Sequence, residues 1–414
     1  MTISQLRINP SRLLENLAEL AKIGALESGG ISRLAFGEED RRGREWFLLK
    51  LREIGLQVSV DCAGNISGLL PGTEPELPRV VTGSHLDTVP NGGPLDGALG
   101  VVAGMEALQT LFESEFRPRR SIELINFSDE EGRFGGLFGS QALAGMLDLQ
   151  KLRRTPDLTG VSLIEALEEC GLNLEKAPRA RRDPATLHAF VELHIEQGPV
   201  LEQEELEIGI VHGVAGLFKW NVRFYGMAAH SGTTPMPMRR DALLGAVDFL
   251  QLSESVLREH GSPHSVCNAG RIEAFPGAAN VVPARVDLTF EVRDTDQDVL
   301  HRLSEAFRNN VSELAHQRGL TSEIEVLSEV APKSCSESVV SVVEGAARDL
   351  KYRHRRMHSG AIHDALIVGE ITDSAMLFVP SRNGRSHCPE EYTSPEQIEA
   401  GANVLLRSLW RLAL

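Results

Sequence analysis

The first group of residues that could do chemistry surrounds His85. The sequence reads GSHLD, with Asp87 two residues after the histidine, and a glycine-rich stretch then leads to Asp96. A histidine beside a carboxylate is typical of a metal ligand and the partner that fixes its ring tautomer. The glycines allow the tight turn that would bring Asp96 back. A structural role fits equally well, because Asp96 could simply cap a helix that begins at Gly97.

A second group consists of the consecutive carboxylates Asp129, Glu130 and Glu131, which follow the apolar segment SIELINFS. Neighbouring carboxylates repel one another unless a cation offsets their charge. Adjacent residues leave a strand end in different directions, so one could bind a metal while the next faces a substrate. A solvated acidic loop is the alternative interpretation of this motif.

Two further histidines complete a set of metal-type side chains. His194 lies in ELHIEQG and His387 lies in NGRSHCPEE, each near the end of another apolar segment. A single histidine is commonly a hydrogen-bonded structural residue, but three histidines with two carboxylates suit two divalent ions. The five cysteines are odd in number, scattered and without a CxxC pair, which argues against a disulfide framework and against thiolate ligands.

Four apolar segments must position these groups, and all four are predicted to be strands. They are 79–84, 121–128, 186–193 and 374–381, with helical patterns at 98–111 and 163–170. Strands alternating with helices predict an α/β domain with a mainly parallel sheet flanked by helices. Because polar sites gather at the carboxyl ends of such strands, we expect the four groups to meet in one cleft.

The middle of the chain has a different pattern. Residues 219–225, 265–272 and 285–293 alternate like half-exposed antiparallel strands, and 240–259 and 297–318 are amphipathic at helical spacing. We therefore predict a catalytic domain of residues 1–212 and 331–414, interrupted by an inserted α+β domain of residues 213–330.

Composition restricts the class of protein further. The 414 residues carry a net charge of −16, which disfavours binding to nucleic acid or to anionic lipid. No stretch approaches the roughly 20 apolar residues of a membrane span, and the first residues lack the apolar block of a secretory signal. These features predict a cytoplasmic protein without nucleic-acid or membrane partners.

Six ordered motifs carry a resemblance to a known family: GSHLDTVPNGGPLDG, SDEEGRFG, ELHIEQGPVLE, AAHSGTTPM, HSGAIHDA and FVPSRNGRSHCPEE. Together they resemble the amidase branch of the zinc aminoacylase/carboxypeptidase superfamily, which includes N-carbamoyl-L-amino acid hydrolases, allantoate amidohydrolases and β-ureidopropionases. The likeness extends from near the N-terminus to about residue 409. It implies a hydrolase acting on non-peptide C–N bonds, with a di-metal catalytic domain and an inserted lid or dimerisation domain.

The resemblance implies a role for each residue of the centre. It implies two divalent ions per subunit, zinc or alternatively manganese or cobalt, with Asp96 bridging them. Glu130 matches the general base, and Asp87 matches the carboxylate beside the first histidine. The implied metal ligands are His85, Asp96, Glu131, His194 and His387.

The substrate contacts are implied in the same way. Arg293 resembles the residue that binds the substrate carboxylate, as a bidentate guanidinium can. His230 resembles a catalytic histidine that reaches the partner subunit's site and contacts the substrate there, which implies a homodimer. The other implied substrate contacts are Gln197, Asn280, Gly360 and His363. From the residues alone, an exposed strand arginine is the preferred interpretation of Arg293, and a turn histidine that of His230.

The expected reaction is hydrolysis of the terminal carbamoyl group of an N-carbamoyl amino acid, giving the amino acid, carbon dioxide and ammonia. Hydrolysis of allantoate or β-ureidopropionate is the alternative. A dipeptidase, an N-acyl amino acid hydrolase and a non-catalytic zinc-binding scaffold fit less well. Two departures bear on the substrate: the stretch GRFGGLFGSQALAG after Glu131 is about two residues shorter than the family pattern, and Ile362 replaces a usual glycine.

Overall fold

The computed structural model describes residues 5–114 and 117–414, and the chain divides into two compact units. The first unit contains Met1–His212, Cys335–Met357 and His363–Leu414, and the second contains Gly213–Ser334 and His358–Ile362. The roles expected for them, catalysis for the first and closure or dimerisation for the second, stay predictions.

The first unit is built on a sheet whose centre is parallel, as predicted. Its strands are ordered β1-β2-β4-β3-β5-β15-β6, and β14 pairs with β6. The four central strands β4, β3, β5 and β15 run parallel, whereas β1, β2 and β6 are antiparallel to their neighbours. The strand bounds are β1 (Gln57–Val60), β2 (Ile66–Leu70), β3 (Arg79–His85), β4 (Ile122–Phe127), β5 (Leu187–Ile195), β6 (Ile208–Val214), β14 (His354–Ser359) and β15 (Ser374–Val379).

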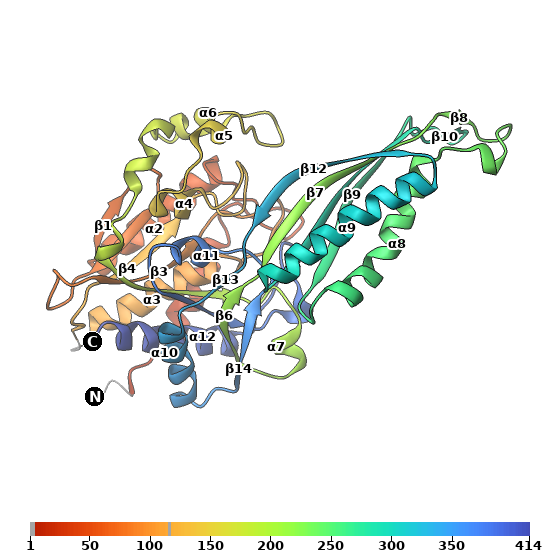
Figure 1. The fold of residues 1–414 in the computed structure, drawn as a ribbon. Coiled ribbons are helices and arrows are strands. Elements are labelled where there is room, and N and C mark those ends of the chain that lie inside the picture. Colours follow the sequence, from red (N-terminus) through yellow and green to blue (C-terminus); the bar gives the residue numbers. More distant parts are fainter. Residues whose placement is uncertain (1–4, 115–116) are drawn as a thin grey trace. The chain divides into compact units, whose positions relative to one another are not determined.

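Helices cover both faces of this sheet. The cluster of buried apolar side chains on one face joins the sheet to α3, α10 and α12, which lie together below it in Figure 1. On the other face α11 packs on β5 and α4 on β4. The helix bounds are α1 (Pro10–Leu20), α2 (Glu38–Ile54), α3 (Ala98–Glu113), α4 (Phe138–Ala144), α5 (Leu149–Leu152), α6 (Leu163–Glu169), α7 (Val200–Gln203), α10 (Glu337–Asp349), α11 (Asp364–Val368) and α12 (Pro395–Leu412).

Strand β5 shows how the sequence separates core from chemistry. Successive side chains of a strand point to opposite faces. Val191, Leu193 and Ile195 enter the apolar cluster with α3 and α12. The residues between them, Glu192 and His194, are equally buried but face the other side. An apolar run that is buried on both faces therefore delivers two polar side chains to one face.

The second unit is an antiparallel sheet with two helices on one face (Figure 1). Its strand order is β12-β7-β11-β9, and the apolar sides of β7 and β11 pack against α8 and α9. The predicted strands and helices of this region are present, and β12 is an edge strand that the sequence pattern did not single out. The bounds are β7 (Gly216–Tyr225), β8 (Ala229–His230), α8 (Ala242–His260), β9 (Val266–Phe275), β10 (Val281–Val282), β11 (Arg285–Asp294), α9 (Gln297–Gln317), β12 (Thr321–Val330) and β13 (Lys333–Ser334).

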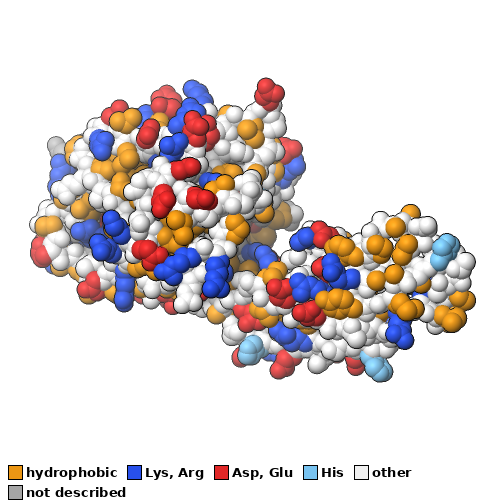
Figure 2. Space-filling model, turned by 90° about the horizontal axis from the view of Figure 1, so that it is seen from above, with side chains coloured by type: hydrophobic (Ala, Val, Ile, Leu, Met, Phe, Trp, Pro, Cys, Tyr) orange, Lys and Arg blue, Asp and Glu red, His pale blue; other side chains and the backbone are white. Residues whose placement is uncertain are grey.

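Large apolar side chains are exposed on the surface of the second unit, and Figure 2 shows hydrophobic side chains there between charged ones. The large exposed ones are Met227, Met236, Met238, Val247, Leu252, Val266, Ile272, Val326 and Leu327. Exposed apolar patches of this kind mark interaction surfaces more often than isolated residues do. Among the described residues, none of the helices has the length and apolarity required to span a membrane.

Candidate metal centre

His85 and His194 present the same ring nitrogen to one point at the carboxyl ends of β3 and β5. His85 Nδ1 lies 2.9 Å from the carbonyl oxygen of Asp87, and His194 Nδ1 lies 2.9 Å from that of Ile195. Each Nδ1–H donates to a carbonyl oxygen, so the lone pair of each Nε2 is left to face the cluster. Burial lowers the pKa of His85 to about 4, which keeps this ring neutral, as a metal ligand must be.

Asp96 lies between two groups of metal-type side chains. Its Oδ1 is 3.1 Å from His194 Nε2 and 3.6 Å from His85 Nε2, whereas its Oδ2 is 3.3 Å from His387 Nε2. Two triplets with mutually close ligand atoms share this residue: His85–Asp96–His194 and Asp96–Glu131–His387. One carboxylate oxygen of Asp96 therefore faces the two histidines of the first triplet, and the other faces His387 of the second.

The loop geometry around Asp96 depends on Gly97. Its φ is +62°, and a Cβ there would lie 2.4 Å from the His85 ring. Gly97 N–H also donates to His194 Nε2 at 3.2 Å. A side chain at position 97 would therefore displace the His85 ring, so the glycine-rich stretch serves close approach as well as turning.

Glu130 and Glu131 follow β4 and enter the same cluster. Glu130 Oε2 lies 3.5 Å from His85 Nε2, and Glu131 Oε2 lies 3.5 Å from His387 Nε2. Burial raises the pKa of Glu130 well above its ordinary value, and the nearby Asp364 carboxyl raises it further. Burial and the Asp96 carboxylate raise the pKa of Glu131 to about 8. Glu130 thus lies beside a member of one triplet and Glu131 beside a member of the other.

The donor set fits divalent metal ions. Several buried carboxyls converge on one point and their pKa values are raised, so the cluster carries more acid groups than its own cations offset. Glu131 Oε1 is buried and has no hydrogen-bond partner among the described residues. Burying such groups unpaired is costly, and bound cations would remove the cost. Histidine nitrogens with carboxylate oxygens suit zinc, manganese or cobalt.

Asp87 supports the centre differently from the expectation. Its carbonyl oxygen, rather than its carboxylate, accepts the His85 Nδ1 bond, and the carboxylate oxygen nearest to that nitrogen is 3.8 Å away. The carboxylate accepts the backbone N–H groups of Glu130 at 3.4 Å and Glu131 at 3.1 Å. Asp87 therefore ties the loop after β3 to the loop after β4.

Gln197 and His363, which the resemblance assigns to substrate binding, lie at the edge of the cluster. Gln197 Nε2 donates to Asp96 Oδ2 at 2.7 Å. The buried His363 ring lies against the His194 ring, with the centroids 4.4 Å apart and the ring planes tilted by 59°. A third triplet, Glu192–His194–His363, is less suited to a metal. Glu192 already accepts from Ser84 Oγ and from Ala365 N–H, and His194 Nε2 faces Asp96.

The remaining expected contacts belong to the second unit, where they form two pairs. Arg293 donates to the Gly360 carbonyl oxygen at 2.6 Å and to Glu291 Oε1 at 2.7 Å. His230 lies on β8, which pairs with β10, and the neighbouring Ser231 N–H donates to the Asn280 carbonyl oxygen at 3.0 Å. His230 and Asn280 are exposed, and nothing lies within 4 Å of a Cβ built on Gly360.

The sequence reasoning missed Glu391, which holds Asp96 in place. Its Oε1 accepts the backbone N–H groups of Leu95 at 2.8 Å and Asp96 at 3.0 Å, and its Oε2 lies 2.9 Å from Ser386 Oγ. Ser386 Oγ is also 2.7 Å from Asp96 Oδ2. Gly93 makes room for this carboxylate, since a Cβ there would lie 2.2 Å from it. The position of Glu391, four residues after His387, was the one available signal.

The fold and this cluster define a metal-dependent hydrolase of C–N amide bonds. The chain belongs to peptidase family M20/M25/M40, whose sequence model matches residues 81–411. That match covers the sheet of the first unit from β3 onwards and every residue of the cluster. The predicted amidase branch is confirmed by the relatives that follow.

Relatives of known activity match almost the entire chain. An N-carbamoyl-L-amino acid amidohydrolase of Geobacillus stearothermophilus is 40% identical over 409 residues, which are 98% of this chain and 99% of that protein. An allantoate amidohydrolase of Escherichia coli strain K12 is 34% identical over 96% of this chain and 97% of that protein. The crystal structure of a hydantoinase/carbamoylase family amidase from Burkholderia multivorans superposes with a TM-score of 0.90 at 36% identity, covering 99% of this chain and 98% of that one.

We expect removal of bound metal to make stability fall as pH rises. In the metal-free cluster, burial disfavours the charged form of His194, but Asp96 outweighs it and raises the pKa to about 9. The bond to Asp96 likewise raises the pKa of His387 to about 9. A histidine with a raised pKa loses its stabilising contribution above its unfolded value of about 6.5. Glu131, with its pKa at about 8, becomes increasingly unfavourable over the same interval.

His194 and His387 act in this direction between about pH 6.5 and about pH 9, and Glu131 adds to their effect up to about pH 8. The Tm of chelator-treated protein should therefore fall by several degrees from pH 6.5 to pH 8.5, and the Tm of metal-loaded protein by clearly less. Thermal melts of both forms at the two pH values measure this difference. Equal Tm changes in the two forms would show that the cluster carries no uncompensated charge.

Proposed function

We propose that this chain hydrolyses the terminal carbamoyl group of N-carbamoyl-L-amino acids, releasing the amino acid, carbon dioxide and ammonia. The observation that carries the proposal is the shared position of Asp96 between two metal-type triplets, with the buried Glu130 beside one of them. The relative from Geobacillus stearothermophilus, matched from end to end at 40% identity, supports the substrate class.

We propose further that His85, Asp96, Glu131, His194 and His387 hold two divalent ions, with zinc as the first candidate. When bound, such ions polarise the substrate carbonyl and make a water molecule easier to deprotonate. Manganese and cobalt bind the same donor types and stay open as alternatives.

The protein's own groups then handle the proton and the substrate. Glu130, whose pKa is raised, is suited to accept a proton from the attacking water at its carboxylate and to deliver it to the leaving nitrogen. One water balances the reaction: the ureido C–N bond breaks, the amino acid nitrogen gains a proton, and the carbamic acid decomposes to carbon dioxide and ammonia. Arg293 is proposed to bind the substrate carboxylate, with Asn280, Gly360, Gln197 and His363 as further contacts.

A substrate panel tests the activity. The metal-loaded protein should release ammonia from N-carbamoyl-L-amino acids with a kcat/KM at least about tenfold above that for allantoate and for β-ureidopropionate. Allantoate is the second candidate, because the Escherichia coli relative is an allantoate amidohydrolase. A higher kcat/KM for allantoate would reverse the order. Hydrolysis of dipeptides or N-acetyl amino acids alone would remove the carbamoyl assignment.

We propose that the protein is a homodimer in which His230 serves the partner's site. His230 is exposed on the unit that carries the apolar surface residues, which supports an interface on that unit. A two-fold symmetric dimer presents the same patch twice. The cytoplasmic location expected from the sequence stays a prediction.

Subunit exchange tests the composite site. Glu130→Gln protein and His230→Ala protein, each nearly inactive alone, should regain activity when mixed. Random exchange makes half of the dimers mixed, and each mixed dimer has one intact site in two, so recovery should approach about one quarter of the native rate. If mass measurements show complete exchange and no activity returns, His230 does not act on the partner's site.

A further inference from the structure

We propose that a cavity beside Glu131 binds an apolar side chain of the substrate, so that the enzyme prefers N-carbamoyl amino acids with large aliphatic or aromatic side chains. This inference rests on the proposed function and specifies its substrate. The cavity has a volume of about 340 Å³ and lies within the first unit. Small-molecule pockets begin at about this size.

The cavity reaches the metal centre through two residues. Asp87 and Glu131 line it, and Glu131 Oε2 lies 3.5 Å from His387 Nε2. In an N-carbamoyl amino acid a single nitrogen separates the ureido carbon from Cα. A ureido group held at the cluster therefore places the side chain of the substrate immediately beside the cluster, and this cavity is a space that opens there.

The other walls offer apolar surface. Leu34 and Ala35 come from the segment before α2, and Val89 and Pro90 come from the loop after β3. On the opposite wall, the charge of Arg133 is already taken up by protein groups. Its guanidinium pairs with Asp157 Oδ2 at 2.9 Å, donates to the Ala35 carbonyl oxygen at 2.7 Å and lies over the Phe134 ring. No free cation is thus evident in this described lining to attract an anionic side chain.

Leu158 is the lining residue with the largest unsatisfied apolar surface. Its side chain is fully exposed, at 102% of its reference area. The turn that carries it is held by Asp157 Oδ1, which accepts from Thr159 N–H at 2.8 Å, from Thr159 Oγ1 at 2.7 Å and from Val161 N–H at 3.0 Å. A well-bonded turn that holds a leucine in water beside an apolar cavity gains by covering that leucine with a ligand.

The stretch directly after Glu131 belongs to the same wall. Gly132 and Arg133 line the cavity, and the chain then turns back so that Leu137 N–H donates to the Glu130 carbonyl oxygen at 3.2 Å.

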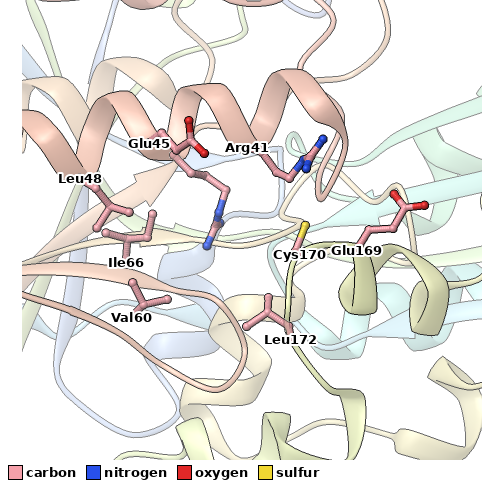
Figure 3. Close-up of a pocket in the computed structure, with 9 residues that line it drawn as sticks. Arg41, Glu45, Leu48, Val60, Ile66, Glu169, Cys170 and Leu172 are labelled. Carbon is pink, nitrogen blue, oxygen red and sulfur yellow. The ribbon is translucent and has the colours of Figure 1, made fainter.

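A second cavity of the first unit, of about 230 Å³, does not compete for this role (Figure 3). Leu48, Val60 and Ile66 lie on one side of it, and Arg41, Glu169 and Cys170 on the other. Its lining contains none of the residues of the metal centre. A ligand bound there would have no direct contact with the reacting groups.

The test is a series of N-carbamoyl-L-amino acids with the side chains of glycine, alanine, valine, leucine and phenylalanine. Burying a methylene group favours binding about three- to fourfold, so kcat/KM should rise at least about tenfold from alanine to leucine. In Leu158→Ser and Val89→Ser, the ratio of kcat/KM for the leucine substrate to that for the glycine substrate should fall by about fivefold or more. Leu49→Ser, a change at an exposed leucine of α2 outside the cavity, should leave that ratio as in the native protein.

A flat series in the native protein overturns the inference, as does an equal loss on the glycine and leucine substrates in both cavity variants. Neither outcome touches the proposed function, because N-carbamoylglycine would still be hydrolysed. If metal-loaded protein hydrolyses no member of the series, the proposed function fails first and the subsite fails with it.

Discussion

Glu130→Gln should lower kcat by about a hundredfold or more while metal content and Tm stay close to native. The amide has nearly the same shape as the carboxylate but cannot accept the proton of the attacking water. Glu130 Oε2 lies 3.5 Å from His85 Nε2, so the residue is at the cluster without belonging to either triplet that shares Asp96. Removing its charge therefore leaves every proposed metal ligand in place.

Steady-state rates, metal analysis and thermal melts on the same preparation separate these effects. Glu53→Gln, at an exposed position of α2, is the control for replacing a carboxylate by an amide. A metal-replete Glu130→Gln protein with near-native kcat would show that another group accepts the proton.

Asp96→Asn should lower metal binding at both positions and reduce activity by about a thousandfold or more, because a shared ligand is lost along with its charge. His387→Ala is the graded comparison. His387 belongs to one triplet and Asp96 to both, so the histidine variant should keep about one ion per subunit and the aspartate variant fewer.

Metal stoichiometry after dialysis against a fixed free-metal concentration measures the difference. If Asp96→Asn retains two ions per subunit with native affinity, the shared-ligand assignment is wrong. Full stoichiometry in a His85→Ala, His387→Ala double variant would also remove the histidines from the ligand set.

The parallel sheet and the convergence of the polar groups were predictable from the sequence, because the polar residues lie close in the sequence to the strands that position them. His85 is the last residue of β3, Glu130 and Glu131 follow shortly after β4, and parallel strands bring their carboxyl ends to one edge. The sequence pattern also predicted most strands and helices of the second unit. One face of its sheet is exposed, so apolar and polar residues alternate along its strands.

The supporting contacts were not predictable, because they depend on distant backbone. Glu391 accepts hydrogen bonds from the backbone N–H groups of Leu95 and Asp96, which lie almost 300 positions earlier in the chain. Asp87 was expected to orient His85 through its carboxylate, but the short turn after β3 places its carbonyl oxygen nearer to the ring. Spacing in the sequence identified Asp87 as the partner of His85. It could not show that the carbonyl oxygen of Asp87, rather than its carboxylate, accepts the bond. The substrate contacts of the second unit came from resemblance alone.

Along strand β5 of this enzyme, core residues and site residues alternate with a period of two. Val191, Leu193 and Ile195 are core residues, and Glu192 and His194 alternate with them on the other face. Deleting or inserting one residue within the strand would exchange the faces, placing a carboxylate and an imidazole in the oil-like interior and aliphatic groups at the cluster. An insertion or deletion within β5 therefore preserves the faces only if it changes the length by an even number of residues. Loops at either end of the strand are free of that constraint. A designer who grafts this centre onto another sheet inherits the same parity rule.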